Sequence, residues 1–223
     1  MSGDADSQAV GLVGVLARSR ELGFLGPGPL AEQIGHSRAF GELVREALGS
    51  GMPEASGHFL DLGAGGGLPG LVLLDEWPSA TAVLVDAQEK RCRFLSESVA
   101  ELGWEHRAEV RCGRAEVLAR DPELRARFGL VVARGFGPPA VTAECAVGFL
   151  SPGGMLAVTE PPSGPTTDIG AERWPEEGVR QVGFGPAMRL RSALAGAACL
   201  IVGENTENRW PRRDGVPGKR PLW

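Results

Sequence analysis

The sequence predicts an α/β domain built on a seven-stranded, mainly parallel sheet. Short apolar runs alternate with amphipathic stretches over residues 58–159, the pattern of strands joined by crossover helices. A cluster of glycines follows the first apolar run, and glycine allows a backbone to approach a ligand closely. The 223 residues suit one such domain with a small addition, and 43% hydrophobic residues are ordinary for a folded core.

Residues 1–57 are predicted to form a helical lead-in. Apolar side chains recur at helical spacing over residues 10–22 and 38–48, which indicates two helices. The segment 23–35 between them contains the run GPGP, and we expect a rigid turn there because glycine and proline interrupt helices. His36 is expected to cap or pack this lead-in, with a catalytic role as the alternative.

The core domain is predicted over residues 58–208, and its elements follow from the changes in apolar pattern. Strands are expected at 58–62, 81–86, 108–112, 129–133 and 155–159. Helices are expected at 70–76, 89–102, 123–127 and 139–149. Two further strands, 179–184 and 195–202, would complete the sheet, the last one antiparallel. Ligands of such sheets bind at the carboxyl ends of the strands.

Two segments outside these elements are expected to serve the ligand. Residues 160–178 are rich in Pro, Gly and Ser and are a candidate lid or substrate loop. Residues 209–223 form a basic tail with five basic residues and one acid, so the net charge of −5 divides into +4 on the tail and −9 elsewhere. Such a tail can bind phosphates. A solvated surface is the alternative.

Composition argues against several kinds of site and location. The four cysteines are widely spaced and form no C-x-x-C pair, which speaks against a metal site and for reduced thiols. The first residues carry Asp4 and Asp6 where a secretory signal needs basic residues. No apolar stretch reaches the roughly 18 residues of a membrane span. We therefore expect a cytoplasmic protein without a metal and without a membrane partner.

The glycine turn, residues 61–70 (DLGAGGGLPG), is interpreted as a cofactor turn. It also fits the G-x-G-x-x-G pattern of dinucleotide enzymes, which is weak on its own. Asp61 favours S-adenosylmethionine, because a carboxylate at the strand end can face the ammonium group of that cofactor. In a pyrophosphate site, a negative charge at this position would repel the bound phosphates. Asp86, 21 residues after Gly65, is expected to bind the ribose that either cofactor carries.

Residues in and after the turn resemble the methyltransferase G family (RsmG, also called GidB). The resemblance rests on the glycine turn, on VDAQEKRCRFL at 85–95, on Arg114-Ala115-Glu116 and on Ala133-Arg134. The ending, with WPRRDGVPGKRPL, resembles the actinobacterial members of the family. That family methylates N7 of a guanine in small-subunit (16S) ribosomal RNA. The resemblance therefore implies a class I S-adenosylmethionine-dependent methyltransferase with a Rossmann-like fold and ribosomal RNA as its partner.

The resemblance also implies roles for individual residues. Ala115 and Glu116 would flank the adenine, and Arg134 would lie near cofactor and substrate. The full predicted cofactor set is Asp61, Gly63, Gly65, Gly67, Leu68, Asp86, Ala115, Glu116 and Arg134. No catalytic residue is assigned, because the guanine N7 has a lone pair without a proton and needs no general base. Glu116 or Glu160 is the alternative base for a hydroxyl or amine acceptor.

Substrate contacts are predicted from aromatic and basic residues. Phe136 is expected to stack on a base, with simple packing as the alternative. The basic residues are expected near RNA phosphates, with a solvated helix face or tail as the alternative. The predicted substrate set is Arg134, Phe136, Lys90, Arg91, Arg212 and Arg213.

Three departures from the family pattern leave the acceptor open. Glu160 follows the fifth strand where the family has Lys-Gly, which puts an acid near the expected substrate mouth. The His-x-x-Asp/Asn-Ser/Cys element of the family is replaced by HSRAF at 36–40, and the Asn-Leu-Thr signature before it is absent. A divergent member or a paralogue with another acceptor fits these departures. A methyltransferase of a small metabolite, a dinucleotide oxidoreductase and a non-catalytic nucleotide-binding module stay as alternatives.

Overall fold

Seven strands and eight helices carry the fold in the parts of the chain that the computed structural model describes, residues 4–49, 57–161, 173–204 and 207–223. The strands are β1 (His58–Leu62), β2 (Thr81–Asp86), β3 (Ala108–Cys112), β4 (Phe128–Ala133), β5 (Leu150–Glu160), β6 (Met188–Arg191) and β7 (Gly196–Ile201). The helices are α1 (Asp4–Glu21), α2 (Leu30–Leu48), α3 (Gly70–Glu76), α4 (Glu89–Glu101), α5 (Ala115–Leu118), α6 (Pro139–Val147), α8 (Glu176–Gln181) and α9 (Val216–Lys219).

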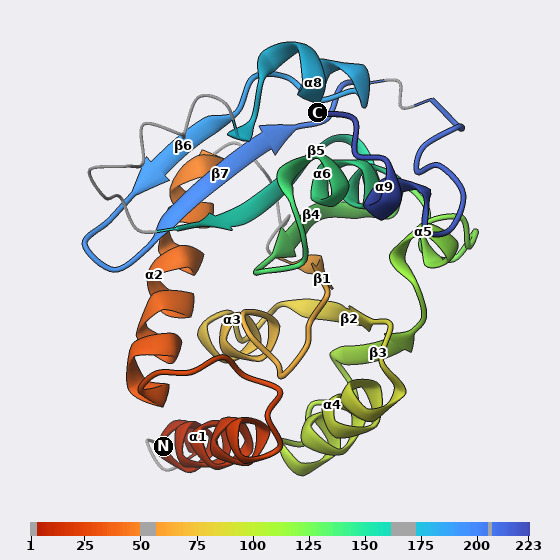
Figure 1. Ribbon diagram of the computed structural model, residues 1–223. Coiled ribbons are helices and arrows are strands. Elements are labelled where there is room, and N and C mark those ends of the chain that lie inside the picture. The colour runs from red at the N-terminus through yellow and green to blue at the C-terminus, as the bar shows by residue number, and fades with distance from the viewer. Residues whose placement is uncertain (1–3, 50–56, 162–172, 205–206) are drawn as a thin grey trace.

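The strands form one sheet in the order β3-β2-β1-β4-β5-β7-β6 (Figure 1). The first five strands pair in parallel, whereas β7 pairs antiparallel with β5 and with β6. The sequence-based prediction of a seven-stranded α/β fold with an antiparallel last strand is confirmed. All five parallel strands end at the same edge, where a ligand site is expected.

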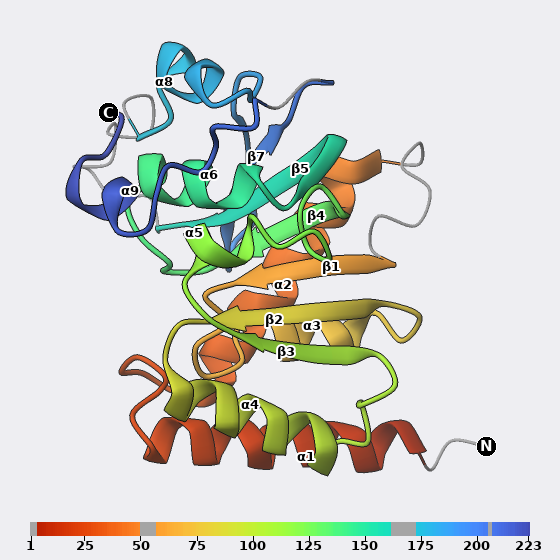
Figure 2. The ribbon, with the colours of Figure 1, turned by 90° about the vertical axis from the view of Figure 1, so that its right-hand side faces the viewer.

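Helices cover both faces of the sheet (Figure 2). Strand side chains alternate between the faces, so Phe59 packs in one apolar cluster and Leu60 in the other. The Phe59 cluster contains buried residues of α1, α2, α3 and α4, and the Leu60 cluster contains those of α5, α6 and α8. The helical lead-in therefore lies on one side of the domain. The basic tail packs on the other side, where its Trp210 and Trp223 join the Leu60 cluster.

Three predicted elements differ from the structure. Helix α2 begins at Leu30, inside the predicted turn 23–35, because the residues after Pro29 are good helix formers and proline suits a helix start. Segment 123–127 is a turn, and Ala126 at φ 54° interrupts any helix there.

The third difference concerns the sheet edge. Segment 179–184 is not a strand, since α8 occupies its first half and only Phe184 makes an isolated bridge, to Val202. The edge strand is instead β6, which is mostly exposed. Its sequence MRLR contains no continuous apolar stretch from which a strand could be predicted.

Candidate cofactor site

The glycine turn lies at the carboxyl end of β1, and its backbone requires glycine. Gly63, Gly65 and Gly67 take φ values of 76°, 56° and 101°, a region that side chains rarely permit. A Cβ on Gly63 would also lie 2.7 Å from Cδ2 of Phe136. The turn therefore keeps its shape because three residues lack side chains, and Phe136 packs directly against it.

Asp61 lies beneath this turn and is completely buried. Its Oδ2 accepts a hydrogen bond from the Gly70 N–H at 2.8 Å, at the start of α3. Its Oδ1 is also buried and has no hydrogen-bond partner among the described residues. Burial, with a smaller contribution from the Asp86 charge, raises the pKa of Asp61 to about 7, although the Gly70 N–H and Arg134 favour the ionised form. A buried carboxylate oxygen without a donor fits a cationic ligand group.

Asp86 ends β2 with its carboxylate held at two points. Its Oδ2 accepts from the Gly65 N–H at 2.9 Å, and its Oδ1 accepts from the Gln88 N–H at 2.8 Å. The Arg91 guanidinium lies 3.8 Å away. Each carboxylate oxygen has a second lone pair, so the fixed carboxylate can still accept hydrogen bonds from a diol.

Two adjoining cavities open beside the turn. The first, of about 190 Å³, is lined by Asp86, Gly113, Ala115 and Phe136 among others. The second, of about 420 Å³, is lined by Leu68 and Arg134 and by residues 24–27 of the lead-in. Gly63, Arg91 and Gly135 line both. The predicted cofactor residues Gly63, Gly65, Leu68, Asp86, Ala115 and Arg134 line one or both of these cavities, whereas Asp61, Gly67 and Glu116 line neither.

Comparison with known proteins decides the family of the chain. The family of rRNA small subunit methyltransferase G (GidB) matches residues 47–160. The chain belongs to this family. Ribosomal RNA small subunit methyltransferase G of Deinococcus deserti is 35% identical over 179 residues, which cover 79% of this chain and 72% of that protein. The Frankia alni protein of the same name is 34% identical and is covered over 65% of its length, against 72% of this chain.

Solved structures show the same fold at lower identity. Cofactor-bound Rv0187 from MTB aligns with a TM-score of 0.56 at 18% identity, covering 87% of this chain and 90% of that one. A protein of Klebsiella pneumoniae assigned as an O-methyltransferase aligns with a TM-score of 0.54 at 15% identity and covers 91% of each chain. The resemblance to the methyltransferase G family, predicted from the glycine turn and the motifs after it, is confirmed.

Some predicted site residues of this methyltransferase G family member lie elsewhere. Glu116, expected to flank the adenine, is buried outside the cavity linings. Its Oε1 accepts from Arg114 Nη2 at 2.9 Å and from the Gly215 N–H of the tail at 3.1 Å. Lys90, predicted to contact RNA phosphates, is exposed on α4. Only Ala115 of the Ala115-Glu116 pair reaches the cavity, because neighbouring residues at a helix start point in different directions.

One cation of the basic tail is paired inside the fold. Arg212 forms a two-pronged ion pair with Glu144 of α6, with Nε 2.7 Å from Oε1 and Nη2 2.6 Å from Oε2. Glu144 is completely buried, so its charge needs this partner. The guanidinium of Arg212, predicted as a substrate-binding cation, is thus engaged by a carboxylate inside the fold. Arg213 is exposed.

Glu160, expected as an acid at the substrate mouth, is buried at the end of β5. Its carboxylate accepts hydrogen bonds from Arg173 Nε at 3.2 Å and from Trp174 Nε1 at 3.0 Å. Glu160, which departs from the family pattern, is therefore paired inside the protein with Arg173. The predicted lid, 160–178, falls largely on residues 162–172, which lie outside the described parts of the chain.

Sequence reasoning missed contacts from the lead-in. Arg134 was expected near cofactor and substrate, and it lines the second cavity. Its Nη1 also donates to Ser37 Oγ at 3.1 Å and to the Gln33 carbonyl at 3.4 Å. Ser19 Oγ donates to the Gly66 carbonyl in the turn at 2.8 Å. His36, next to Ser37, has a buried Nδ1 without a partner in the described chain, and burial lowers its pKa. No sequence pattern marks these serines.

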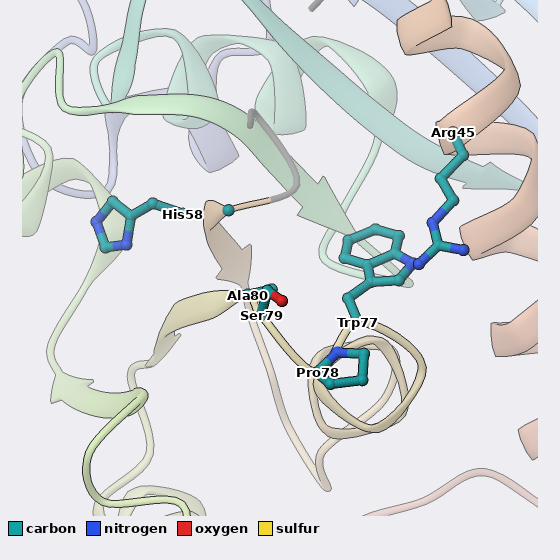
Figure 3. A pocket seen from close by; sticks show the side chains of 7 residues that line it. Arg45, His58, Trp77, Pro78, Ser79 and Ala80 are labelled. Atoms are coloured by element: carbon teal, nitrogen blue, oxygen red, sulfur yellow. The ribbon is translucent and has the colours of Figure 1, made fainter. Parts of the chain in front are cut away.

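A cavity of about 650 Å³, larger than the two beside the turn, lies at the amino ends of the strands. Figure 3 shows the side chains that line it. It borders His58 and Ala80, at the amino ends of β1 and β2, and the Arg45 guanidinium lies 5.4 Å from the Trp77 ring centre. Since ligands of parallel sheets bind at the carboxyl edge, this cavity is not assigned to the cofactor. Within residues 4–49, 57–161, 173–204 and 207–223, no helix has the length and apolar character of a membrane span.

Proposed function

We propose that this chain transfers a methyl group from S-adenosylmethionine to N7 of a guanine in small-subunit ribosomal RNA. The observation that supports this proposal is the buried Asp61, one oxygen of which has no partner among the described residues. It lies beneath a glycine turn beside Asp86, in a chain of the methyltransferase G family. A dinucleotide site would not keep an acid under its phosphate turn. Such an enzyme would work in the cytoplasm, where its ribosomal RNA is.

The chain offers a separate group for each part of the cofactor. Asp86 is positioned to accept hydrogen bonds from the ribose hydroxyls, and Ala115 lines the cavity beyond it. Asp61 Oδ1, buried beneath the turn without a donor in the described chain, would accept a hydrogen bond from the ammonium group. The cofactor, when bound, supplies a methyl group on a positively charged sulfur. Because the pKa of Asp61 is raised by burial, a cationic partner would favour its ionised form and displace a proton.

Positioning is the main chemical task that these residues perform. A guanine N7 attacks the methyl group in line with the departing sulfur, so alignment at near-attack distance gives the rate enhancement. Phe136, packed against Gly63 at the cavity wall, can orient a planar base by stacking. Arg91 and Arg134 line the second cavity and supply positive charge where an RNA phosphate would approach.

A small-metabolite acceptor loses its main support. The metabolite hypothesis depended on Glu160 as an acid at the substrate mouth. In the structure Glu160 is buried and paired with Arg173 and Trp174. The general base proposed for a hydroxyl or amine acceptor is likewise engaged, since Glu116 binds Arg114 and Gly215. The geometry therefore favours an acceptor that needs no base, such as guanine N7.

The test is methyl transfer with purified protein. Small ribosomal subunits from cells lacking this gene would be incubated with the protein and S-adenosylmethionine labelled in the methyl group, and N7-methylguanine would be mapped by chemical cleavage of the RNA. We expect one new modified guanine in the small-subunit RNA. Label in a small-molecule extract but none in RNA would replace this function with the metabolite alternative. The Asp86→Ala variant is the negative control, since it removes the ribose acceptor.

A further inference from the structure

The helical lead-in reaches the cofactor site through two buried serines. Ser37, on α2, is completely buried, and its Oγ donates to the Gln33 carbonyl one turn earlier at 2.9 Å. The same oxygen accepts from Arg134 Nη1 at 3.1 Å. Arg134 also donates to the Gln33 carbonyl at 3.4 Å. A single turn of α2 thus holds one end of the Arg134 guanidinium.

This contact restricts a side chain that lines the second cavity. Arginine has several rotatable bonds and loses conformational entropy when it is fixed, so an unsupported Arg134 would sample many positions. Its donation to Ser37 and Gln33 uses only Nη1 of the planar fork, on a side chain that lines the second cavity. Preorganisation of this kind lowers the cost of ligand binding.

The second serine supports the glycine turn in the same way. Ser19, on α1, is completely buried, and its Oγ donates to the Gly66 carbonyl at 2.8 Å. The fit is close, since a Cβ on Gly66 would collide with that hydroxyl and would lie 2.7 Å from Leu25 Cδ2. A glycine-rich turn is intrinsically free to move, and this bond fixes it from the lead-in side.

We propose that Ser37 and Ser19 are positioning residues of the cofactor site, Ser37 for Arg134 and Ser19 for the glycine turn. The helical lead-in is then a working part of the site. The inference rests on the proposed function, since it assigns these serines to S-adenosylmethionine binding.

The first test is calorimetric titration of S-adenosylmethionine into Ser37→Ala, Ser19→Ala and a matched control, Ser98→Ala. Ser98 is a completely buried serine on α4 whose Oγ donates to the Phe94 carbonyl at 2.7 Å, so it shares the burial and the helix bond but lies outside the site. We expect Ser37→Ala to weaken binding roughly tenfold, as for loss of a hydrogen bond to a charged group. Ser19→Ala should weaken it several-fold, and Ser98→Ala less than twofold.

The second test separates positioning from general support of the fold. In an Arg134→Ala background, Ser37→Ala should cause no further loss of affinity, because the group that it positions is gone, whereas Ser19→Ala should still cause its full loss. An equal loss from Ser37→Ala in both backgrounds would overturn its positioning role. If Ser37→Ala is unstable, Ser37→Cys, which is a weak acceptor of similar size, replaces it in the cycle.

The outcomes also distinguish this inference from the function on which it rests. Binding by the wild-type protein with equal, small effects of all three alanine variants would overturn the inference alone. No binding of S-adenosylmethionine by the wild-type protein would overturn the proposed function and the inference together. Thermal unfolding of each variant shows that it is folded under the conditions of the titration.

Discussion

The helical lead-in and the basic tail flank the core domain on opposite sides and differ in what their polar groups do. On the lead-in side, Ser19 and Ser37 bind the turn and Arg134 at the cofactor site. On the tail side, Arg212 binds the buried Glu144, and Trp223 Nε1 donates to the Arg173 carbonyl at 3.2 Å. The tail looked like the ligand-binding part by charge, and the lead-in looked like packing. In the structure Arg212 of the tail is held by Glu144, and we propose that the serines of the lead-in position the cofactor site.

This difference shows what charge along a sequence can and cannot indicate. An arginine can bind a phosphate only if no internal carboxylate already holds it. Because Glu144 lies 68 residues before Arg212 in the sequence, the local charge pattern of the tail does not reveal their pairing. A buried serine carries no charge yet can fix a charged side chain at a site. The comparison predicts that tail variants change stability first and that lead-in variants change ligand affinity first.

The largest expected effect is on the tail side. Arg212→Ala should lower the free energy of unfolding by about 3–5 kcal/mol, because it leaves a buried carboxylate without its partner. Arg213→Ala, at the exposed neighbour, should change it by less than about 0.5 kcal/mol. Denaturant unfolding followed by tryptophan fluorescence measures both. A stable Arg212→Ala protein with weakened RNA binding would restore the tail as a phosphate-binding element.

The next effect concerns Asp61, which lies on the lead-in face of the sheet like Phe59. Its pKa is raised from 3.8 to about 7, so between these values the ligand-free folded protein holds a proton that the unfolded chain releases. Stability from this group is present below about pH 4 and is lost as pH rises to about 7, on the order of 1.4 kcal/mol per pH unit within that window.

Asp61→Asn removes this titration. Unfolding free energies of the two proteins, measured from pH 4 to 8, should therefore diverge, with the wild-type protein losing more stability as pH rises. Parallel curves would show that Asp61 ionises normally in the fold. The variant should also bind S-adenosylmethionine more weakly, since an amide cannot offer a negative charge to the ammonium group.

A smaller effect is expected where the lead-in meets the turn. Gly66→Ala would place a methyl group against Ser19 and Leu25 and should cost about 1–3 kcal/mol of stability, together with most of the cofactor affinity. Gly14→Ala is the matched control on α1, where an added Cβ meets nothing within 4 Å and should stabilise the helix by about 0.5–1 kcal/mol. Normal cofactor binding by Gly66→Ala would contradict the claim that the contact between the lead-in and the turn supports cofactor binding.

The smallest expected effect is on RNA binding, and it distinguishes the surface around Lys90 on α4 from the surface around Arg213 on the tail. Lys90 is exposed and, within the described residues, has no ion-pair partner, so Lys90→Ala should weaken RNA binding a few-fold and reduce its salt dependence by about one unit of slope. Arg213→Ala, on the tail side, should leave that slope unchanged. Filter binding at several salt concentrations checks both. The reverse result would place RNA on the tail.

The sequence predicted the parallel part of the fold well for a physical reason. Strands β1, β2 and β3 match the expected residues because each is a short run bounded by turn-forming residues. Helix α8 and strand β6 were missed, since Val179 and Val182 fit either period and MRLR has no apolar run. Such elements are decided by tertiary packing.

The candidate site was predicted in part for similar reasons. Asp61, Asp86 and Arg134 sit at strand ends, and strand ends meet at one edge in any parallel sheet. Ser19 and Ser37 were not predictable, because a serine carries no pattern and the bond between Ser37 and Arg134 spans 97 residues. The pairing of Arg212 with Glu144, which are 68 residues apart, shows the same limit for charge.

The most direct measurement of the central claim is a calorimetric titration of the wild-type protein with S-adenosylmethionine and, separately, with NAD and NADP. The site beneath the glycine turn predicts one molecule of S-adenosylmethionine bound per chain, with proton release to the buffer near pH 6, and no heat from either dinucleotide. Binding of a dinucleotide in place of S-adenosylmethionine, or of neither, would contradict the assignment of Asp61 and Asp86 to a methyl donor.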